Sequence, residues 1–338
     1  MVYGAIDLHT RYSQIRILDA TGAVLSDRRV VTTRERLVAG FAGHGPIRIL
    51  LETGTESEWV AQALEGAGYE VIVADPNFAP MYGDLQRKVK TDRRDVAALA
   101  DANRRGWYRP AYRPSAPARA LRQVLRARRQ LVSMRSGTIS VIRALLRQEG
   151  YRLPPGNAER IPARVARVVL PSARRTTLTP LVETVAALTA QIATIDARLA
   201  PVAAQDPVVQ RLQTVPGIGP VVALTFRARI DEVTRFASAG QVSAALGLVP
   251  HEDSSAERRH RGHITKAGPP ELRSLLVQAA WACWRSRRGA PLRQWAETVA
   301  SRRGRRIAVV GLARRLSRIL FAIWRDGTTY RPEILVGA

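Results

Sequence analysis

The sequence contains a single cysteine, Cys283, among its 338 residues. One thiol excludes disulfide bonds within the chain and any zinc site built from several thiolates. Apolar residues surround Cys283, so we expect it to be a core residue. The N-terminus has no charged segment leading into an apolar one, and no run approaches the roughly 20 apolar residues of a membrane span. We therefore expect a cytoplasmic protein with no membrane partner.

Lysine is scarce throughout, and acidic residues become scarce beyond residue 100. Only three of the 53 basic residues are lysines, a bias that a GC-rich genome would also produce. Residues 1–100 hold 12 basic and 13 acidic residues, so the net charge of +25 arises beyond residue 100. This excess indicates a polyanionic partner, and planar guanidinium groups suit phosphate contacts. The basic part of the chain is the predicted nucleic-acid surface.

Apolar runs separated by turn residues organise the first hundred positions. The expected elements are strands at 2–8, 13–19, 23–31, 46–52 and 70–75, and helices at 34–42, 57–67 and 92–105. Three consecutive strands followed by alternating strands and helices are typical of a mixed sheet with helices packed on it. The predicted fold class is α/β in this part, followed by a mostly helical region.

A proline-rich linker follows, and then one long basic helix is predicted over 118–148. A coiled-coil seam is predicted from apolar residues at alternating spacings of four and three: Leu181, Val185, Leu188, Ile192, Ile195 and Leu199. We expect its helix to begin at Thr179 and Pro180 and to stop at Pro201. A dimer contact is favoured, and an antiparallel pair with 118–148 within one chain is the alternative.

The last third of the chain is predicted to be a second compact, basic and mostly helical domain. Its expected helices span about 207–213, 218–230, 238–246, 269–286, 290–300 and 304–325. The resulting domain boundaries are 1–110, 115–206 and 207–330.

Four carboxylates, Asp7, Glu52, Asp92 and Asp95, stand in settings where a solvated acid is not expected. Asp7 and Glu52 interrupt or end apolar strands, where an uncompensated charge would be costly. Asp92 and Asp95 are three residues apart and share one face of a helix. Clustered carboxylates are the ligands that Mg²⁺ prefers, so we predict a metal site, although any one acid could instead be a cap or turn residue.

Two further segments could contact phosphate. Gly217 and Gly219 lie in Pro216-Gly217-Ile218-Gly219-Pro220, which opens a helix whose free amides could hold a phosphate; an ordinary turn is the alternative. The polar segment 247–268 is typical of a functional loop. It carries Ser254 and Ser255, and then Arg258, Arg259, Arg261 and Lys266. A serine here could be a nucleophile beside phosphate-binding cations, or incidental to an arginine-rich contact loop.

With these residues in place, the sequence resembles the DEDD-type transposases of bacterial insertion sequences, a family of RNA-guided serine recombinases. The Ile6-Asp7 strand, Glu52-Thr53-Gly54 and Lys90–Ala97 resemble its RuvC-like, RNase H-fold domain. The segments Val215–Gly219, Gly247–Pro250, Ser254-Ser255, Gly262–Lys266 and Leu272-Arg273 resemble its C-terminal transposase domain. The sequence departs from the usual family pattern at Ala256, where glycine normally follows the serine pair.

This resemblance implies that Asp7, Glu52, Asp92 and Asp95 bind Mg²⁺ and that Ser254 attacks DNA phosphate. It also implies a structured non-coding guide RNA, and a homodimer or homotetramer acting on element ends and target DNA. The three domains would then be a catalytic RuvC-like domain, an oligomerisation region and a serine-bearing transposase domain. Two rivals remain: a metal-dependent junction-resolvase-like endonuclease using water, and a non-enzymatic nucleic-acid-binding protein.

Overall fold

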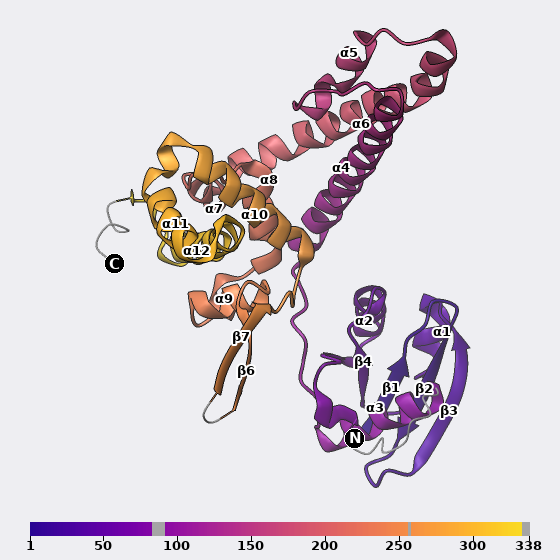
Figure 1. Cartoon of the computed structure of the whole chain (residues 1–338). Helices are drawn as coiled ribbons and strands as arrows, with labels where there is room; N and C mark the ends of the chain where they lie inside the picture. The colour runs from indigo at the N-terminus through magenta and orange to yellow at the C-terminus, as the bar shows by residue number, and fades with distance from the viewer. Residues whose placement is uncertain (83–91, 256–257, 333–338) are drawn as a thin grey trace. The chain divides into compact units, whose positions relative to one another are not determined.

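The computed structural model describes residues 1–82, 92–255 and 258–332. The side chains of residues 253–261 lie outside this description. The chain forms two compact units, Met1–Arg113 and Pro114–Ala338, and each is considered by itself (Figure 1).

The described part of the N-terminal unit contains a five-stranded sheet and three helices. Its strands are β1 (Val2–Asp7), β2 (Tyr12–Leu18), β3 (Val24–Val31), β4 (Ile47–Glu52) and β5 (Glu70–Ala74). Its helices are α1 (Arg34–Ala39), α2 (Ser57–Gly66) and α3 (Asp92–Arg105), with a short 3₁₀ turn η1 (Ala79–Tyr82). The strand order is β3-β2-β1-β4-β5, antiparallel from β3 to β1 and parallel from β1 to β5. The predicted mixed α/β class is confirmed, and this topology is consistent with an RNase H-like fold.

Both faces of this sheet are covered, which explains why β1 and β4 are almost continuously apolar. Ile6 and Leu51 point to one face and pack in a core cluster that also contains residues of α1 and α2. Ala5 and Leu50 point to the other face and pack in a cluster with the buried side of α3. Because successive strand residues alternate between faces, the α3 face also receives Asp7 and Glu52.

The C-terminal unit begins with two long helices joined by a short one. They are α4 (Ala116–Gln148), α5 (Ile161–Ala166) and α6 (Ser172–Gln205), with a 3₁₀ turn η2 (Ala158–Arg160). In Figure 1, α4 and α6 lie side by side. Arg128 of α4 forms an ion pair with Asp196 of α6, and Arg174 of α6 forms one with Glu149 at the end of α4. These two ion pairs show that α4 and α6 run antiparallel.

This pairing uses the predicted coiled-coil seam within the chain. Val185 shares a core cluster with Ile142 of α4, and Leu199 shares another with Leu125 of α4. The alternative of an intrachain antiparallel pair is therefore what the structure contains. The predicted helix limits were wrong, because α6 begins at Ser172 and continues through Pro180 and Pro201 to Gln205. Both prolines lie on the exposed side, where water can satisfy the carbonyl groups that a proline leaves free.

The rest of this unit is a helical bundle around one core cluster. Its helices are α7 (Pro207–Leu212), α8 (Pro220–Ile230), α9 (Ala239–Ala245), α10 (Pro270–Arg285), α11 (Ala290–Arg303) and α12 (Arg305–Asp326), with 3₁₀ turns η3 (Val233–Arg235) and η4 (Arg287–Gly289). Cys283 is fully buried in this cluster, as predicted, and burial raises the pKa of its thiol to about 11.

The segment between α9 and α10, predicted as a loop, forms an antiparallel hairpin of β6 (Pro250–Ser255) and β7 (Arg258–Ile264). Its base is closed by two glycines with positive φ. A Cβ on Gly247 would lie 2.1 Å from the carbonyl oxygen of Ala267, and one on Gly268 would lie 1.9 Å from that of Ala245. Only glycine allows the backbones to approach this closely, so the base of the hairpin is fixed in its orientation.

Among the described residues, α6 is long and apolar enough to cross a membrane by length and composition alone. It packs along α4, and its Asp196 forms an ion pair with Arg128. These contacts are typical of a helix in a bundle, and one such helix is weak grounds for a membrane span.

Candidate functional site

The predicted acidic residues of β1 and β4 lie at one edge of the N-terminal sheet. Ile6 pairs with Leu51 in the parallel ladder, so the next residues, Asp7 and Glu52, stand side by side at the ends of their strands. Both follow the alternation that directs them to the α3 face. The sheet itself therefore places these two residues next to each other at one edge, although Glu52 is not in the group of three donor atoms described below.

Helix α3 supplies the other two acids, since Asp92 and Asp95 both lie in its first turn. The charge of each acts on Asp7, so both are close to it. Acids in a first helical turn are also favoured by the free amides and the helix dipole. Lys90 and Thr91, which precede them in the predicted segment, lie outside the described residues.

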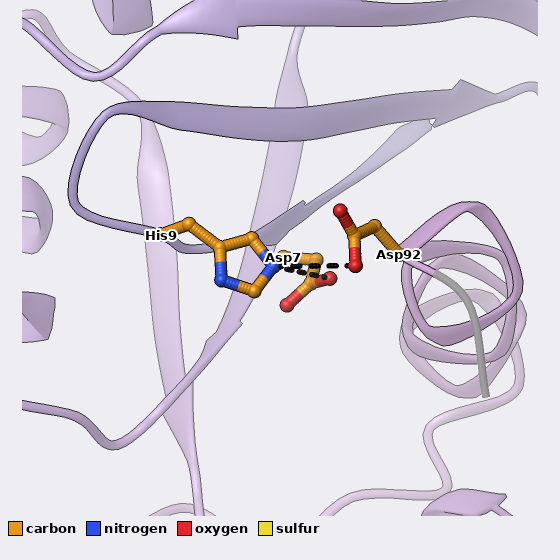
Figure 2. Close-up of side chains that lie close together, drawn as sticks. All are labelled: Asp7, His9 and Asp92. Atoms are coloured by element: carbon orange, nitrogen blue, oxygen red, sulfur yellow. Dashed lines mark ion pairs between the residues drawn. The ribbon is translucent and has the colours of Figure 1, made fainter.

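His9 joins this acidic cluster, and sequence reasoning missed it. Its Nε2 lies 3.3 Å from Oδ2 of Asp7 and 3.5 Å from Oδ1 of Asp92, as Figure 2 shows. The loop that carries His9 is held by hydrogen bonds: Oγ1 of Thr32 donates to the carbonyl oxygen of His9, and Oγ of Ser13 accepts from its amide. A signal was available in the sequence, because His9 lies only two residues beyond Asp7, the last residue of β1.

The electrostatics of the cluster are unfavourable without a cation. Burial raises the pKa of Asp7, and the charges of Asp92 and Asp95 raise it further, whereas His9 lowers it. The Asp7 side chain is 20% exposed and that of Asp92 is 66% exposed, so the cluster is open to solvent on its α3 side. Negative charge gathered at a partly buried strand end is the setting that a divalent cation stabilises.

The donor set fits a divalent metal ion. Asp7, His9 and Asp92 each offer one ligand atom, and these three atoms lie within 4.8 Å of one another. Carboxylate oxygens suit Mg²⁺, which needs only one or two of them when substrate phosphate and water complete its shell. An imidazole ligand would also suit Mn²⁺ or other transition ions.

The second set of predicted residues lies in the C-terminal unit. Ser254 is on β6, where its backbone pairs with Arg259 of β7. The side chains of Ser254, Arg258, Arg259 and Arg261 lie outside the described residues. Lys266 is exposed at the base of the hairpin and has a φ of 55°, an unusual conformation for a residue with a side chain.

The predicted glycine turn precedes α8, and its two glycines differ. Gly217 has a φ of 84°, and a Cβ there would lie 2.3 Å from the carbonyl oxygen of Ala279 in α10. Packing against α10 therefore requires glycine at this position, whatever else the turn does. Gly219 is the N-cap of α8, and a Cβ there would meet no atom within 4 Å.

An α/β unit with carboxylates gathered at a sheet edge, followed by a basic helical unit, is typical of metal-dependent enzymes that act on nucleic acid. Two family models match the chain. Residues 5–150 match the DEDD transposase model of the IS110 type, and residues 209–295 match the model described as "Transposase IS116/IS110/IS902 family". Together the two models cover most of the chain, which thus belongs to the IS110/IS116 family of insertion-sequence transposases.

Relatives agree with this assignment over nearly the full length. The "Probable family 20 transposase" of Pseudomonas aeruginosa is 28% identical over 97% of this chain and 98% of its own. The "Transposase for insertion sequence element IS1111A" of Coxiella burnetii is 28% identical over 96% of this chain and 90% of its own. The "Transposase for insertion sequence element IS1328" of Yersinia enterocolitica is 26% identical, with 96% and 97% covered.

Proposed function

We propose that this transposase excises and inserts DNA through a Mg²⁺-dependent reaction in which Ser254 attacks a DNA phosphate. The observation that carries the proposal is the convergence of Asp7 and Asp92 at one sheet edge, beside Asp95 and Glu52. A divalent cation bound there would stabilise negative charge on the phosphate and lower the pKa of the attacking oxygen. The protein would act in the bacterial cytoplasm, at the DNA.

The carboxylates have a defined part in this scheme. Asp7 and Asp92 would coordinate the cation, with Glu52 and Asp95 completing or orienting its shell. His9, in contact with both Asp7 and Asp92, would orient them, because an imidazole held between two carboxylates restricts their rotamers.

The serine step conserves the energy of the phosphodiester bond. Oγ of Ser254 would form a bond to phosphorus and lose its proton to solvent, while the bond from phosphorus to one DNA oxygen breaks and that oxygen takes a proton from solvent and leaves as a hydroxyl. The resulting phosphoserine ester could be attacked by a new DNA hydroxyl, which reverses the same bond changes on another strand. Arg258, Arg259, Arg261 and Lys266 are the proposed phosphate contacts, with amides near Gly217 and Gly219.

The hairpin geometry supports a role for this segment. Its base is fixed by Gly247 and Gly268, so the strand that carries Ser254 leaves the helical bundle in a defined direction. A structured guide RNA and a dimeric or tetrameric assembly are further parts of the proposal, which rest on the family resemblance and on the strong positive charge beyond residue 100.

Covalent trapping tests the serine mechanism directly. The protein would be incubated with Mg²⁺, with labelled DNA that carries the element junctions and with the non-coding RNA transcribed from the DNA beside the gene, and then denatured. We expect a labelled protein–DNA adduct at Ser254, which Ser254→Ala abolishes and the matched variant Ser255→Ala retains. If Ser254→Ala still cleaves DNA and no adduct forms, water is the nucleophile and the protein is a metal-dependent endonuclease.

The metal requirement has a separate test. Asp7→Asn and Asp92→Asn should each abolish both strand cleavage and binding of Mn²⁺, measured by electron paramagnetic resonance as a substitute for Mg²⁺. Asp101→Asn, which removes a carboxylate from the opposite end of the same helix, is the control. Recombination that survives the first two substitutions would mean that the acids are structural, as in a non-enzymatic binding protein.

A further inference from the structure

A cavity of about 400 Å³ lies between α4, α8 and α10 in the C-terminal unit. Five arginines line it, and Glu271 is the one acid among its described lining residues. The arginines are Arg122, Arg126, Arg128, Arg129 and Arg229. We call this cavity the arginine pocket. None of its lining residues belongs to the acidic cluster or to the β6–β7 hairpin, and the proposed function does not involve them.

The arginines are held in place by contacts on three helices. Arg122, Arg126 and Arg129 are four and three residues apart, so they share one face of α4. Arg229 of α8 forms an ion pair with Glu271, which begins α10, and Nη1 of Arg129 lies 3.5 Å from Oε2 of the same carboxylate. Because Glu271 is only 14% exposed, this bridge fixes two guanidinium groups at the pocket wall.

Arg122 is held by hydrogen bonds to the backbone of α8. Its Nε and Nη2 donate to the carbonyl oxygens of Ala228 and Arg229, 2.8 and 3.2 Å away, at the last turn of α8. A cation at a helix C-terminus is stabilised by the unpaired carbonyls there. The guanidinium groups of Arg122, Arg129 and Arg229 are therefore preorganised around the pocket, whereas Arg126 is exposed.

The positive charges in the pocket repel one another. Burial, together with the neighbouring charges of Arg122, Arg129 and Arg126, lowers the pKa of Arg229 to about 10. A fold that holds like charges together at a half-buried position loses free energy that a bound anion would restore. The anion would be drawn to the side of the pocket formed by α4, where Arg126 is exposed.

Part of the pocket lining, which we call its floor, is apolar, and a site for phosphate alone would not need it. Leu125 and Val132 of α4, Val221 and Ala228 of α8, and Leu275 of α10 line it. Its volume lies in the range of about 300–1,000 Å³ that is usual for small-molecule sites. A flat apolar group and a phosphate joined in one ligand would satisfy both the floor and the arginines, and a nucleotide has this combination.

We propose that the arginine pocket binds a single unpaired nucleotide of the nucleic-acid substrate, with its phosphate on Arg126 and Arg129 and its base over the apolar floor. A base in a duplex cannot enter, because it is paired and stacked, whereas an extruded or single-stranded base can. This inference rests on the proposed function only in taking nucleic acid as the substrate. The source of the nucleotide, DNA or RNA, is a question for the experiment.

Binding in EDTA tests the pocket without the metal reaction. Fluorescence anisotropy of the full chain would be measured with labelled single strands of about 12 nucleotides, as DNA and as RNA, and with a duplex of the DNA strand. Arg126→Ala should raise the Kd for a single strand about 10-fold, because one charged hydrogen-bonded contact is lost. Arg198→Ala, an exposed arginine of α6 outside the pocket, should change it less than about 2-fold.

A second variant tests the apolar floor while leaving every charge in place. Val132→Phe should fill the pocket, raise the Kd for single strands and leave duplex binding within about 2-fold of the wild type. Circular dichroism melting would confirm that both variants fold. A loss confined to DNA or to RNA supports the proposal and identifies the source of the nucleotide.

Two outcomes would overturn the inference. One is equal weakening by Arg126→Ala and Arg198→Ala, which means that the pocket arginines act only through net charge. The other is unchanged single-strand affinity in Val132→Phe. Protein that shows the expected binding pattern but never cleaves DNA with Mg²⁺ would refute the proposed function and leave the pocket assignment standing.

Discussion

Asn103 connects α3 to the sheet, and its removal should loosen the acidic cluster from a distance. It is fully buried. Its Nδ2 donates to the carbonyl oxygens of Gly4 in β1 and Arg48 in β4, both 2.8 Å away, and its Oδ1 accepts from Nε of Arg48 at 2.9 Å. Asp92 begins the helix that Asn103 anchors near its other end.

The expected loss of stability follows from these three hydrogen bonds. Two are between neutral groups and are worth about 0.5–1.5 kcal/mol each, and the one from a guanidinium is worth about 1.5–3 kcal/mol. Since the three share one side chain, their contributions overlap, and we expect Asn103→Ala to lower the free energy of unfolding of the N-terminal unit by about 3 kcal/mol. The cost includes carbonyl groups left buried without a donor.

Hydrogen exchange measured by mass spectrometry on the full chain reports this change locally. A loss of about 3 kcal/mol corresponds to a roughly 150-fold fall in the protection of β1, β4 and α3 amides that exchange through unfolding of the unit. Amides of α10 and α12, in the other unit, are the internal control. The exposed Asn157→Ala should change stability by less than about 0.5 kcal/mol. Unchanged protection of β1 and α3 in Asn103→Ala would refute the assigned anchoring role.

Three more predictions follow from single features. Because the pKa of Asp7 is raised in the folded protein, its contribution to stability is present below the pKa of the unfolded state and is lost as the pH rises through the pKa of the folded state. Urea denaturation should therefore find Asp7→Asn more stable than the metal-free wild type at pH 7. At about pH 3, where the carboxyl is protonated in both states, the variant should be no more stable. Gly217→Ala should cost at least about 2 kcal/mol by thermal denaturation because of its positive φ and its approach to α10, whereas Gly219→Ala, in open space, should not. Ile142→Ala should destabilise the α4–α6 pair by about 3 kcal/mol at every protein concentration, and a loss that depends on concentration would contradict an intrachain pair.

The sheet could be predicted from the sequence because strands that are buried on both faces are almost continuously apolar. Runs such as Ile47–Leu51, which is apolar except for Arg48, have few alternatives to a central strand. The predicted element limits in the first hundred residues differ from the observed ones by at most three residues. The placement of Asp7 and Glu52 at one edge followed from the same runs, because a carboxylate at the end of a buried strand is costly unless a cation or hydrogen bonds compensate its charge.

Other features of the structure have no comparable pattern of apolar residues in the sequence. The hairpin of β6 and β7 is held by backbone hydrogen bonds along a polar sequence, so apolar alternation could not reveal it. Pro180 was taken as a helix start because proline is common there, but an exposed proline is also tolerated inside a long helix. The arginine pocket depends on residues of α4, α8 and α10 that are up to about 150 positions apart, and only the folded chain brings Arg126 and Arg229 together.

The acidic cluster and the arginine pocket are alike in one physical respect: each gathers like charges at a partly buried position. Burial and repulsion raise the pKa of Asp7 in one unit and lower that of Arg229 in the other, so the free protein is less stable than one in which these charges are balanced. A ligand of opposite charge that binds the native state alone restores this stability by mass action. Saturating Mn²⁺ should therefore protect amides of β1 and α3 from hydrogen exchange and leave those of α8 and α10 unchanged, whereas a single strand in EDTA should do the reverse. Protection of both units by either ligand would mean that the two charged sites do not act as separate binding sites.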